Sequence, residues 1–118
     1  MQKNYDKLCF KAAYDAACDH RDDYPVIVHA WIWGDDRGYW FAHAWCEVNE
    51  QVYDYVIEKD PFKRNDYYEN LKVSKKKLIK YKLKDLFMLA MKNKTWGPFD
   101  EKLFKHDGEW AEKLFKYP

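Results

Sequence analysis

The stretch VIVHAWIWGDDRGYWFAHAWCEV, residues 26–48, decides the fold of this chain. Its two halves are rich in β-branched and aromatic residues, which favour strands, and the polar run GDDRG between them is typical of a turn. The tripeptide His-Ala-Trp occurs once in each half, at residues 29–31 and 43–45. We therefore expect a β-hairpin of strands 26–33 and 39–48 with a histidine on each strand.

The segments on both sides of this hairpin predict an α+β fold. Residues 6–18, DKLCFKAAYDAAC, are rich in Ala and contain no Gly or Pro, so they predict an N-terminal helix. Asp6 is its expected N-cap, which places Cys9 in the first turn. This helix is expected to pack on an antiparallel β-meander of three to four strands.

The distal half of the chain continues the pattern. Asn49-Glu50 is a short reversal, so a third strand is expected at 51–57, and the lysine-rich residues 77–82 are a candidate fourth strand. Residues 83–94 have apolar side chains at helical spacing and predict an amphipathic helix. The remaining expectations are a polar loop at 58–70 and a short C-terminal amphipathic segment at 101–118.

Length and composition narrow the class of protein. The 118 residues suit one domain, 1–118, and the formal charge of +1 gives the whole chain no net preference for nucleic acid or membrane. Without an apolar run of membrane-spanning length or a signal peptide, we expect a soluble, cytoplasmic protein. The three cysteines form no CxxC pair and the histidines no HxxxH pair, so neither a disulfide framework nor a metal or other cofactor is expected.

Strand geometry gives the second histidine a partner. If Asn49 and Glu50 are the loop residues, alternation places His43, Trp45 and Asp54 on the same face of neighbouring strands. His43 and Asp54 are then diagonal neighbours, about 7 Å apart at the backbone. A carboxylate beside an imidazole fixes its tautomer and stabilises the imidazolium, as a catalytic base requires.

Cys9 is the cysteine best placed to act as a nucleophile. At the start of a helix, free N–H groups and the helix dipole favour a thiolate and could hold an oxyanion. Cys18 is at the opposite end of the helix, and Cys46 points to the face opposite His43. The side-chain amide of Gln2 or Asn4 is a candidate second oxyanion donor.

These residues resemble a known family. The sequence Leu8-Cys9-Phe10-Lys11-Ala12-Ala13, followed by His43-Ala44-Trp45-Cys46-Glu47-Val48 and Val52-Tyr53-Asp54, resembles the transglutaminase-like branch of the papain-like cysteine enzymes. The resemblance covers residues 5–57 and implies roles of nucleophile, base and orienting acid for Cys9, His43 and Asp54. It implies acyl transfer or hydrolysis on a protein, peptide or other amide-containing substrate. The distal half resembles small uncharacterised phage and bacterial proteins with the same core.

Each candidate residue also has a structural interpretation. Cys9 alone is typical of a buried helix cysteine, and His43 alone of a packed strand residue. His29 lies opposite His43 if GDDRG is a five-residue loop, and is then either a core residue or a site-lining residue. Trp45, like the other tryptophans of the hairpin, is either a core ring or a wall of the site.

A cluster of lysines suggests a different class of function. Residues 72–84 contain seven lysines and no acidic residue. Such a run is usually a solvated surface, but it also suits an acidic partner or nucleic acid bound through Lys75, Lys76 and Lys77. The alternative hypothesis is therefore a catalytically inert binding or inhibitor protein on the same fold, such as an anti-host factor of a phage or mobile element.

Overall fold

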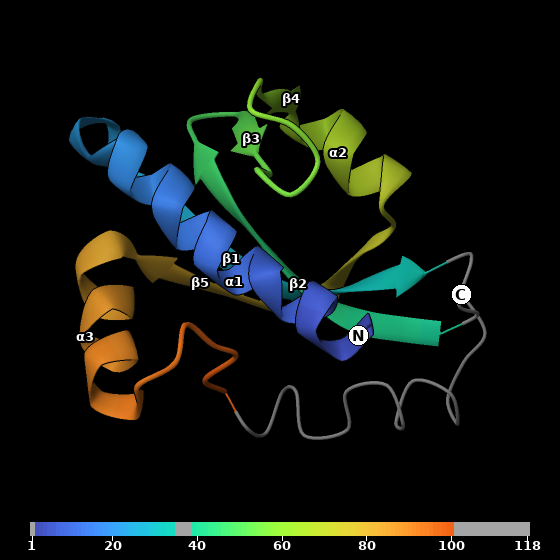
Figure 1. The fold of residues 1–118 in the computed structure, drawn as a ribbon. Coiled ribbons are helices and arrows are strands. Elements are labelled where there is room, and N and C mark those ends of the chain that lie inside the picture. Colours follow the sequence, from blue (N-terminus) through green and yellow to red (C-terminus); the bar gives the residue numbers. More distant parts are fainter. Residues whose placement is uncertain (1, 35–38, 101–118) are drawn as a thin grey trace.

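The computed structural model describes the backbone of residues 2–34 and 39–100, and the side chains of residues 8–33 and 40–100. A long helix lies across a twisted antiparallel sheet, and two shorter helices flank it (Figure 1). The elements in chain order are α1 (Gln2–Asp19), the 3₁₀ helix η1 (Arg21–Asp23), β1 (Val26–Gly34), β2 (Tyr39–Val48), β3 (Gln51–Tyr53), β4 (Phe62–Lys63), α2 (Arg64–Asn70), β5 (Val73–Lys82) and α3 (Leu83–Asn93).

The five strands have the spatial order β4-β3-β2-β1-β5, and all neighbouring pairs are antiparallel. The predicted α+β class, the N-terminal helix and the meander are therefore confirmed. The sheet has five strands where three to four were expected, because the two-residue strand β4 was not predicted. The candidate fourth strand, expected at 77–82, is β5 and spans ten residues. The prediction of a polar loop at 58–70 is wrong from Phe62 onwards, since β4 and α2 occupy that part of it.

The pairing of β1 with β2 corrects the expected register. Gly34 pairs with Tyr39, so four residues separate the strands instead of five. His29 is consequently opposite Ala44, and His43 is opposite Ala30. Because side chains alternate along a strand, this shift of one residue turns the two histidines to opposite faces of the sheet.

Each face of the sheet has its own core. Small side chains line the contact of α1 with the sheet, where Ala13, Ala16 and Ala17 of the helix meet the buried Ala42 and Ala44 of β2. Alanine at such a contact lets a helix axis approach a strand closely. On the other face, α2 packs on β3 and β5, and the buried residues are Val28, Ala30, Ile32, Trp45, Val52, Tyr67 and Val73.

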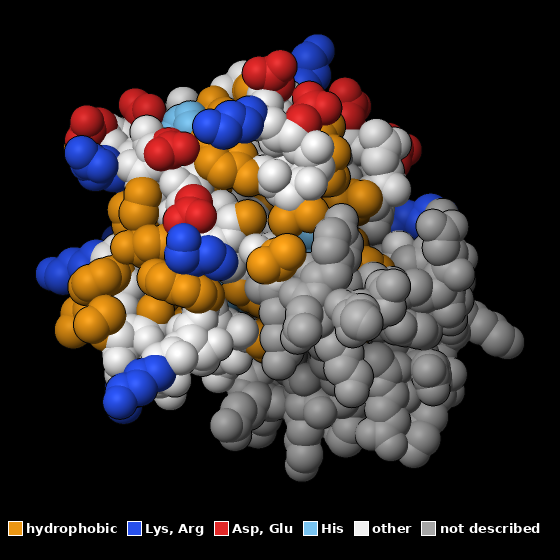
Figure 2. Space-filling model, viewed as in Figure 1, with side chains coloured by type: hydrophobic (Ala, Val, Ile, Leu, Met, Phe, Trp, Pro, Cys, Tyr) orange, Lys and Arg blue, Asp and Glu red, His pale blue; other side chains and the backbone are white. Residues whose placement is uncertain are grey.

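Helix α3 leaves part of its apolar surface exposed. Leu86 and Ala90 are buried as the periodicity predicts, but Phe87, Met88 and Met91 remain 44–62% exposed. Hydrophobic side chains gather on the side of the molecule where α3 lies (Figure 2). No helix among the described residues has the length and apolar character needed to cross a membrane. The predicted C-terminal amphipathic segment at 101–118 lies outside the described residues.

Candidate active site

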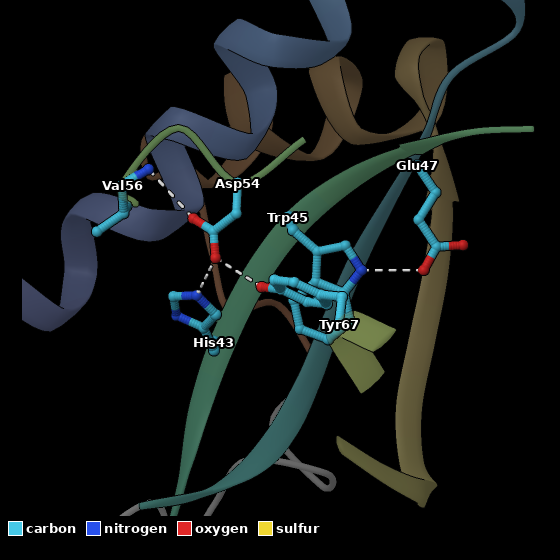
Figure 3. A network of polar contacts seen from close by, with 6 residues as sticks. All are labelled: His43, Trp45, Glu47, Asp54, Val56 and Tyr67. Carbon is cyan, nitrogen blue, oxygen red and sulfur yellow. Dashed lines mark hydrogen bonds and ion pairs between the residues drawn. The ribbon is translucent and has the colours of Figure 1, made fainter. Parts of the chain in front are cut away.

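His43 and Asp54 meet where the sheet narrows. Strand β3 pairs only with Cys46, Glu47 and Val48 of β2, so Asp54 follows directly after the last paired residue of β3. There His43 Nε2 lies 2.8 Å from Asp54 Oδ2, and the carboxylate is almost completely buried (Figure 3). The sequence predicted this pair from strand parity, although the third strand is shorter than the expected 51–57.

The Asp54 carboxylate accepts three hydrogen bonds. The Val56 N–H donates to Oδ1 at 3.1 Å, and the Tyr67 hydroxyl donates to Oδ2 at 2.6 Å, beside His43 (Figure 3). Burial alone would raise the pKa of Asp54, but the hydrogen bonds and the charge of His43 lower it. Asp54 is therefore a carboxylate at neutral pH, with its orientation fixed from both sides.

Cys9 of α1 completes the group. Its side chain is 2% exposed and makes a side-chain hydrogen bond with His43. Because Nε2 of the imidazole faces Asp54, Nδ1 is the ring nitrogen left for the thiol. Burial alone would lower the pKa of His43, but the hydrogen bonds and charges of Asp54 and Cys9 raise it to about 10. The imidazole is therefore protonated at neutral pH.

The helix places Cys9 differently from the sequence-based expectation. Helix α1 begins at Gln2, so Cys9 lies about two turns inside it rather than in its first turn. The N–H of an interior helical residue is bonded to the carbonyl four residues earlier. The prediction that the helix N-terminus activates Cys9, with its N–H as an oxyanion donor, is therefore wrong. The side chains of Gln2 and Asn4, the other candidate donors, lie outside the described residues.

Trp45 lies beside His43 as part of a second polar network. The ring centroids of these two residues are 6.0 Å apart. The Trp45 indole N–H donates to Glu47 Oε2 at 2.9 Å, and the Tyr68 hydroxyl donates to the same oxygen. The buried Glu47 carboxylate also has the cations of Arg64 and Lys80 at 3.9 Å. Trp45 thus borders the candidate site, and its indole ring is held in place by Glu47 and not by Asp54.

His29 occupies an apolar environment on the opposite face of the sheet. It is fully buried, and neither ring nitrogen has a hydrogen-bond partner among the described residues. Its ring packs edge-on against Phe10 and Tyr81 and nearly parallel to Phe99. Burial lowers the pKa of His29 to about 3. The position opposite His43 expected from a five-residue loop is wrong, and these contacts favour the structural interpretation.

The lysines proposed to bind a partner, Lys75, Lys76 and Lys77, lie on β5, an edge strand of the sheet. Ala30 pairs with Leu78 and Ile32 with Val73, so residues 74–77 bulge out of the ladder. Lys75 and Lys76 are exposed within this bulge, and Lys77 is half-buried. The Lys77 N–H donates to Ser74 Oγ at 3.1 Å, which closes the bulge. Lysines and bulges are common on edge strands because they discourage pairing with another chain.

Tyr67 is the site residue that the sequence did not reveal. It comes from α2, within the segment expected to be a polar loop. The segment RNDYYEN is short and polar, so no apolar periodicity marks it as a helix. One signal was present, because two adjacent tyrosines in a polar run are candidates for burial against a sheet.

Comparison with protein-family models, with curated proteins and with solved structures finds no match to this chain. Among the described residues, no cluster of three or more His, Cys, Asp or Glu side chains is arranged to hold a metal ion. The feature that bears on function is the geometry of Cys9, His43 and Asp54.

Proposed function

We propose that this chain is a cysteine-dependent acyl-transfer enzyme with Cys9, His43 and Asp54 as its catalytic triad, on a papain-like or transglutaminase-like core. One observation carries the proposal: a single imidazole bonds a buried carboxylate on one side and a thiol on the other. These are the contacts that a nucleophile, its base and an orienting acid need. The order of the three residues along the chain, on a helix, a strand and the end of the next strand, supports it further.

The proposed reaction uses an ion pair. The Cys9 thiolate attacks the carbonyl carbon of an amide or ester and forms the C–S bond. The protonated His43 donates its proton to the leaving nitrogen or oxygen as that bond breaks, which leaves a thioester on Cys9. Water or an amine then attacks the thioester carbonyl, and His43 accepts the proton of this second nucleophile. The C–S bond breaks, which releases the acyl product and restores the Cys9 thiolate. Asp54 keeps the imidazole oriented throughout.

The burial of Cys9 favours a second candidate, the inert binding protein. A thiol with only 2% of its residue surface exposed offers little room for a substrate carbonyl. The His43 side chain, however, keeps 12% of its surface exposed, so part of the site is in contact with solvent. The two candidates differ in whether Cys9 reacts.

The test is competition between the thiols of this chain. Iodoacetamide at about pH 6 labels thiolates, and a thiol with the ordinary pKa of about 8.5 is almost fully protonated there. We expect labelling of Cys9 before the more exposed Cys18, as located by peptide mass mapping, and loss of this preference in His43→Ala. Labelling of Cys18 first in the wild-type chain would contradict the proposal.

A second measurement asks for the acyl intermediate. p-Nitrophenyl acetate should acylate Cys9 once per chain, and hydroxylamine should remove the acyl group, whereas Cys9→Ser and His43→Ala should remain unmodified. If folded wild-type protein gains no acyl group while Cys9 still outcompetes Cys18, the thiol is activated but the site does not transfer acyl groups. That result would support the inert binding protein.

A further inference from the structure

The hydroxyl of Tyr67 forms a hydrogen bond with the carboxylate of the proposed triad. Its hydroxyl donates to Asp54 Oδ2 at 2.6 Å, the same oxygen that faces His43 Nε2 at 2.8 Å. The ring is 3% exposed and packs edge-on against Trp45, with the centroids 5.1 Å apart. Figure 3 shows the hydroxyl and the imidazole approaching the carboxylate from different elements, α2 and β2.

The hydroxyl is held as a donor at this position. Burial, together with the charge of Asp54 and the hydrogen bond to it, raises the pKa of Tyr67 well above its ordinary value, so the phenol keeps its proton. Its O–H dipole therefore points its positive end toward the carboxylate. Hydrogen bonds from neutral donors to buried charged groups are among the stronger ones in proteins.

We propose, on the basis of the function proposed above, that Tyr67 is a positioning residue that holds the Asp54 carboxylate against His43 and thereby maintains the reactive thiolate–imidazolium pair. Without the hydroxyl, Oδ2 loses one of its two donors and the carboxylate is anchored only through Val56 and His43. The positive end of the dipole also disappears from a region that must carry the negative charges of Asp54 and Cys9. Both changes disfavour the thiolate.

The chain contains a matched control for this idea. Tyr68 is the next residue of α2, and its hydroxyl also donates to a buried carboxylate, but that carboxylate is Glu47. Tyr67→Phe and Tyr68→Phe therefore remove the same group from neighbouring networks. Only Tyr67→Phe removes a hydrogen bond to Asp54. A difference in Cys9 reactivity between the two variants therefore arises from the triad and not from the general loss of a tyrosine hydroxyl.

The experiment measures the rate of Cys9 alkylation by iodoacetamide from about pH 5 to 8 in both variants, alone and combined with Asp54→Asn. We expect Tyr67→Phe to react about tenfold more slowly at pH 6, with its profile moved to higher pH, and Tyr68→Phe to stay within about twofold of wild type. In the Asp54→Asn background, Tyr67→Phe should have almost no further effect, because Tyr67 acts through Asp54.

Each other outcome has a definite meaning. If Tyr67→Phe is folded, by its urea unfolding curve, and keeps the wild-type profile, the positioning role is wrong although the proposed function stands. If the two tyrosine variants slow the reaction equally, the effect is structural and the inference is also wrong. If wild type and His43→Ala react alike, the proposed function itself fails. Should Tyr67→Phe unfold, the more conservative 3-fluorotyrosine at this position must retain wild-type reactivity, or the inference is overturned.

Discussion

The histidines of the two His-Ala-Trp tripeptides carry opposite pKa shifts. His29 lies among aromatic rings and its pKa falls to about 3 because burial is not compensated by any partner. His43 is partly buried, and burial alone would lower its pKa, but its partners raise it to about 10. The same tripeptide thus supplies a neutral core residue on one strand and a cation on the next, because the faces of the sheet differ in what covers them.

The first prediction concerns the effect of His29 on the stability of the fold at low pH. Its pKa is about 3 when folded and about 6.5 when unfolded, so the unfolded chain binds the proton first as the pH falls. The contribution of His29 to stability is therefore complete above about pH 6.5 and is lost toward pH 3, by about 1.4 kcal/mol per pH unit. His29→Leu should remove this loss.

Urea unfolding at pH 7 and pH 5 measures the difference. We expect His29→Leu to gain about 2 kcal/mol relative to wild type between these two values. Using the same protein at pH 7 as its own control separates the titration from any change in packing. Parallel dependence on pH in the two proteins would show that another group dominates acid unfolding.

At the level of elements, the predictable parts of the chain are those with a strong apolar pattern. Strands β1 and β2 and helix α3 were expected within one or two residues, because β-branched and aromatic runs and a 3.6-residue period specify them. Helix α2 and strand β4 were missed because a polar segment of this length carries no period. The face of the sheet predicted for His29 was wrong, because a change of one residue in the length of the β1–β2 loop turns the side chain to the other face.

Strand β5 gives a prediction about association. Its exposed edge is interrupted by the bulge at residues 74–77 and carries lysines that discourage pairing with another chain. Lys76→Val should therefore promote concentration-dependent self-association, measured by size-exclusion chromatography with light scattering. Lys84→Val, which removes another exposed lysine from the first turn of α3, is the control and should remain unchanged.

A second set of lysine variants addresses the partner hypothesis. If the lysines serve an acidic partner or nucleic acid, Lys75→Gln, Lys76→Gln and Lys77→Gln together should weaken binding to a DNA or RNA oligonucleotide and reduce its salt dependence. An unchanged salt dependence would leave edge protection as the role of these residues.

On the scale of the whole molecule, the candidate site joins parts of the chain that are distant in sequence. Cys9, His43, Asp54 and Tyr67 come from α1, β2, the end of β3 and α2. Strand parity predicted the neighbours His43 and Asp54, whereas Cys9 was expected from the resemblance and from a position at the helix start that the structure contradicts. Tyr67 was missed because its place depends on how α2 docks on the sheet, a tertiary contact that the two adjacent tyrosines do not specify by themselves.

Cys46 offers a contrast within the same chain. Its thiol is completely buried on the α1 side of the sheet, and burial, followed by the charges of Glu47 and Cys18, raises its pKa to about 12. In the folded protein it should be inert toward iodoacetamide. Unfolding gives it, like any cysteine in a random chain, an ordinary reactivity.

The contact between the Cys9 thiol and the His43 imidazole has a consequence for following the folding of this protein. Unfolding normally speeds the labelling of a buried cysteine, as Cys46 should show. On the function proposed above, Cys9 should do the reverse at about pH 6, because unfolding separates its thiol from the protonated imidazole of His43. In a urea titration the labelling rate of Cys46 should therefore rise and that of Cys9 should fall, with a common midpoint. Cys46 then measures the population of the unfolded chain, and Cys9 measures the population of the native protein.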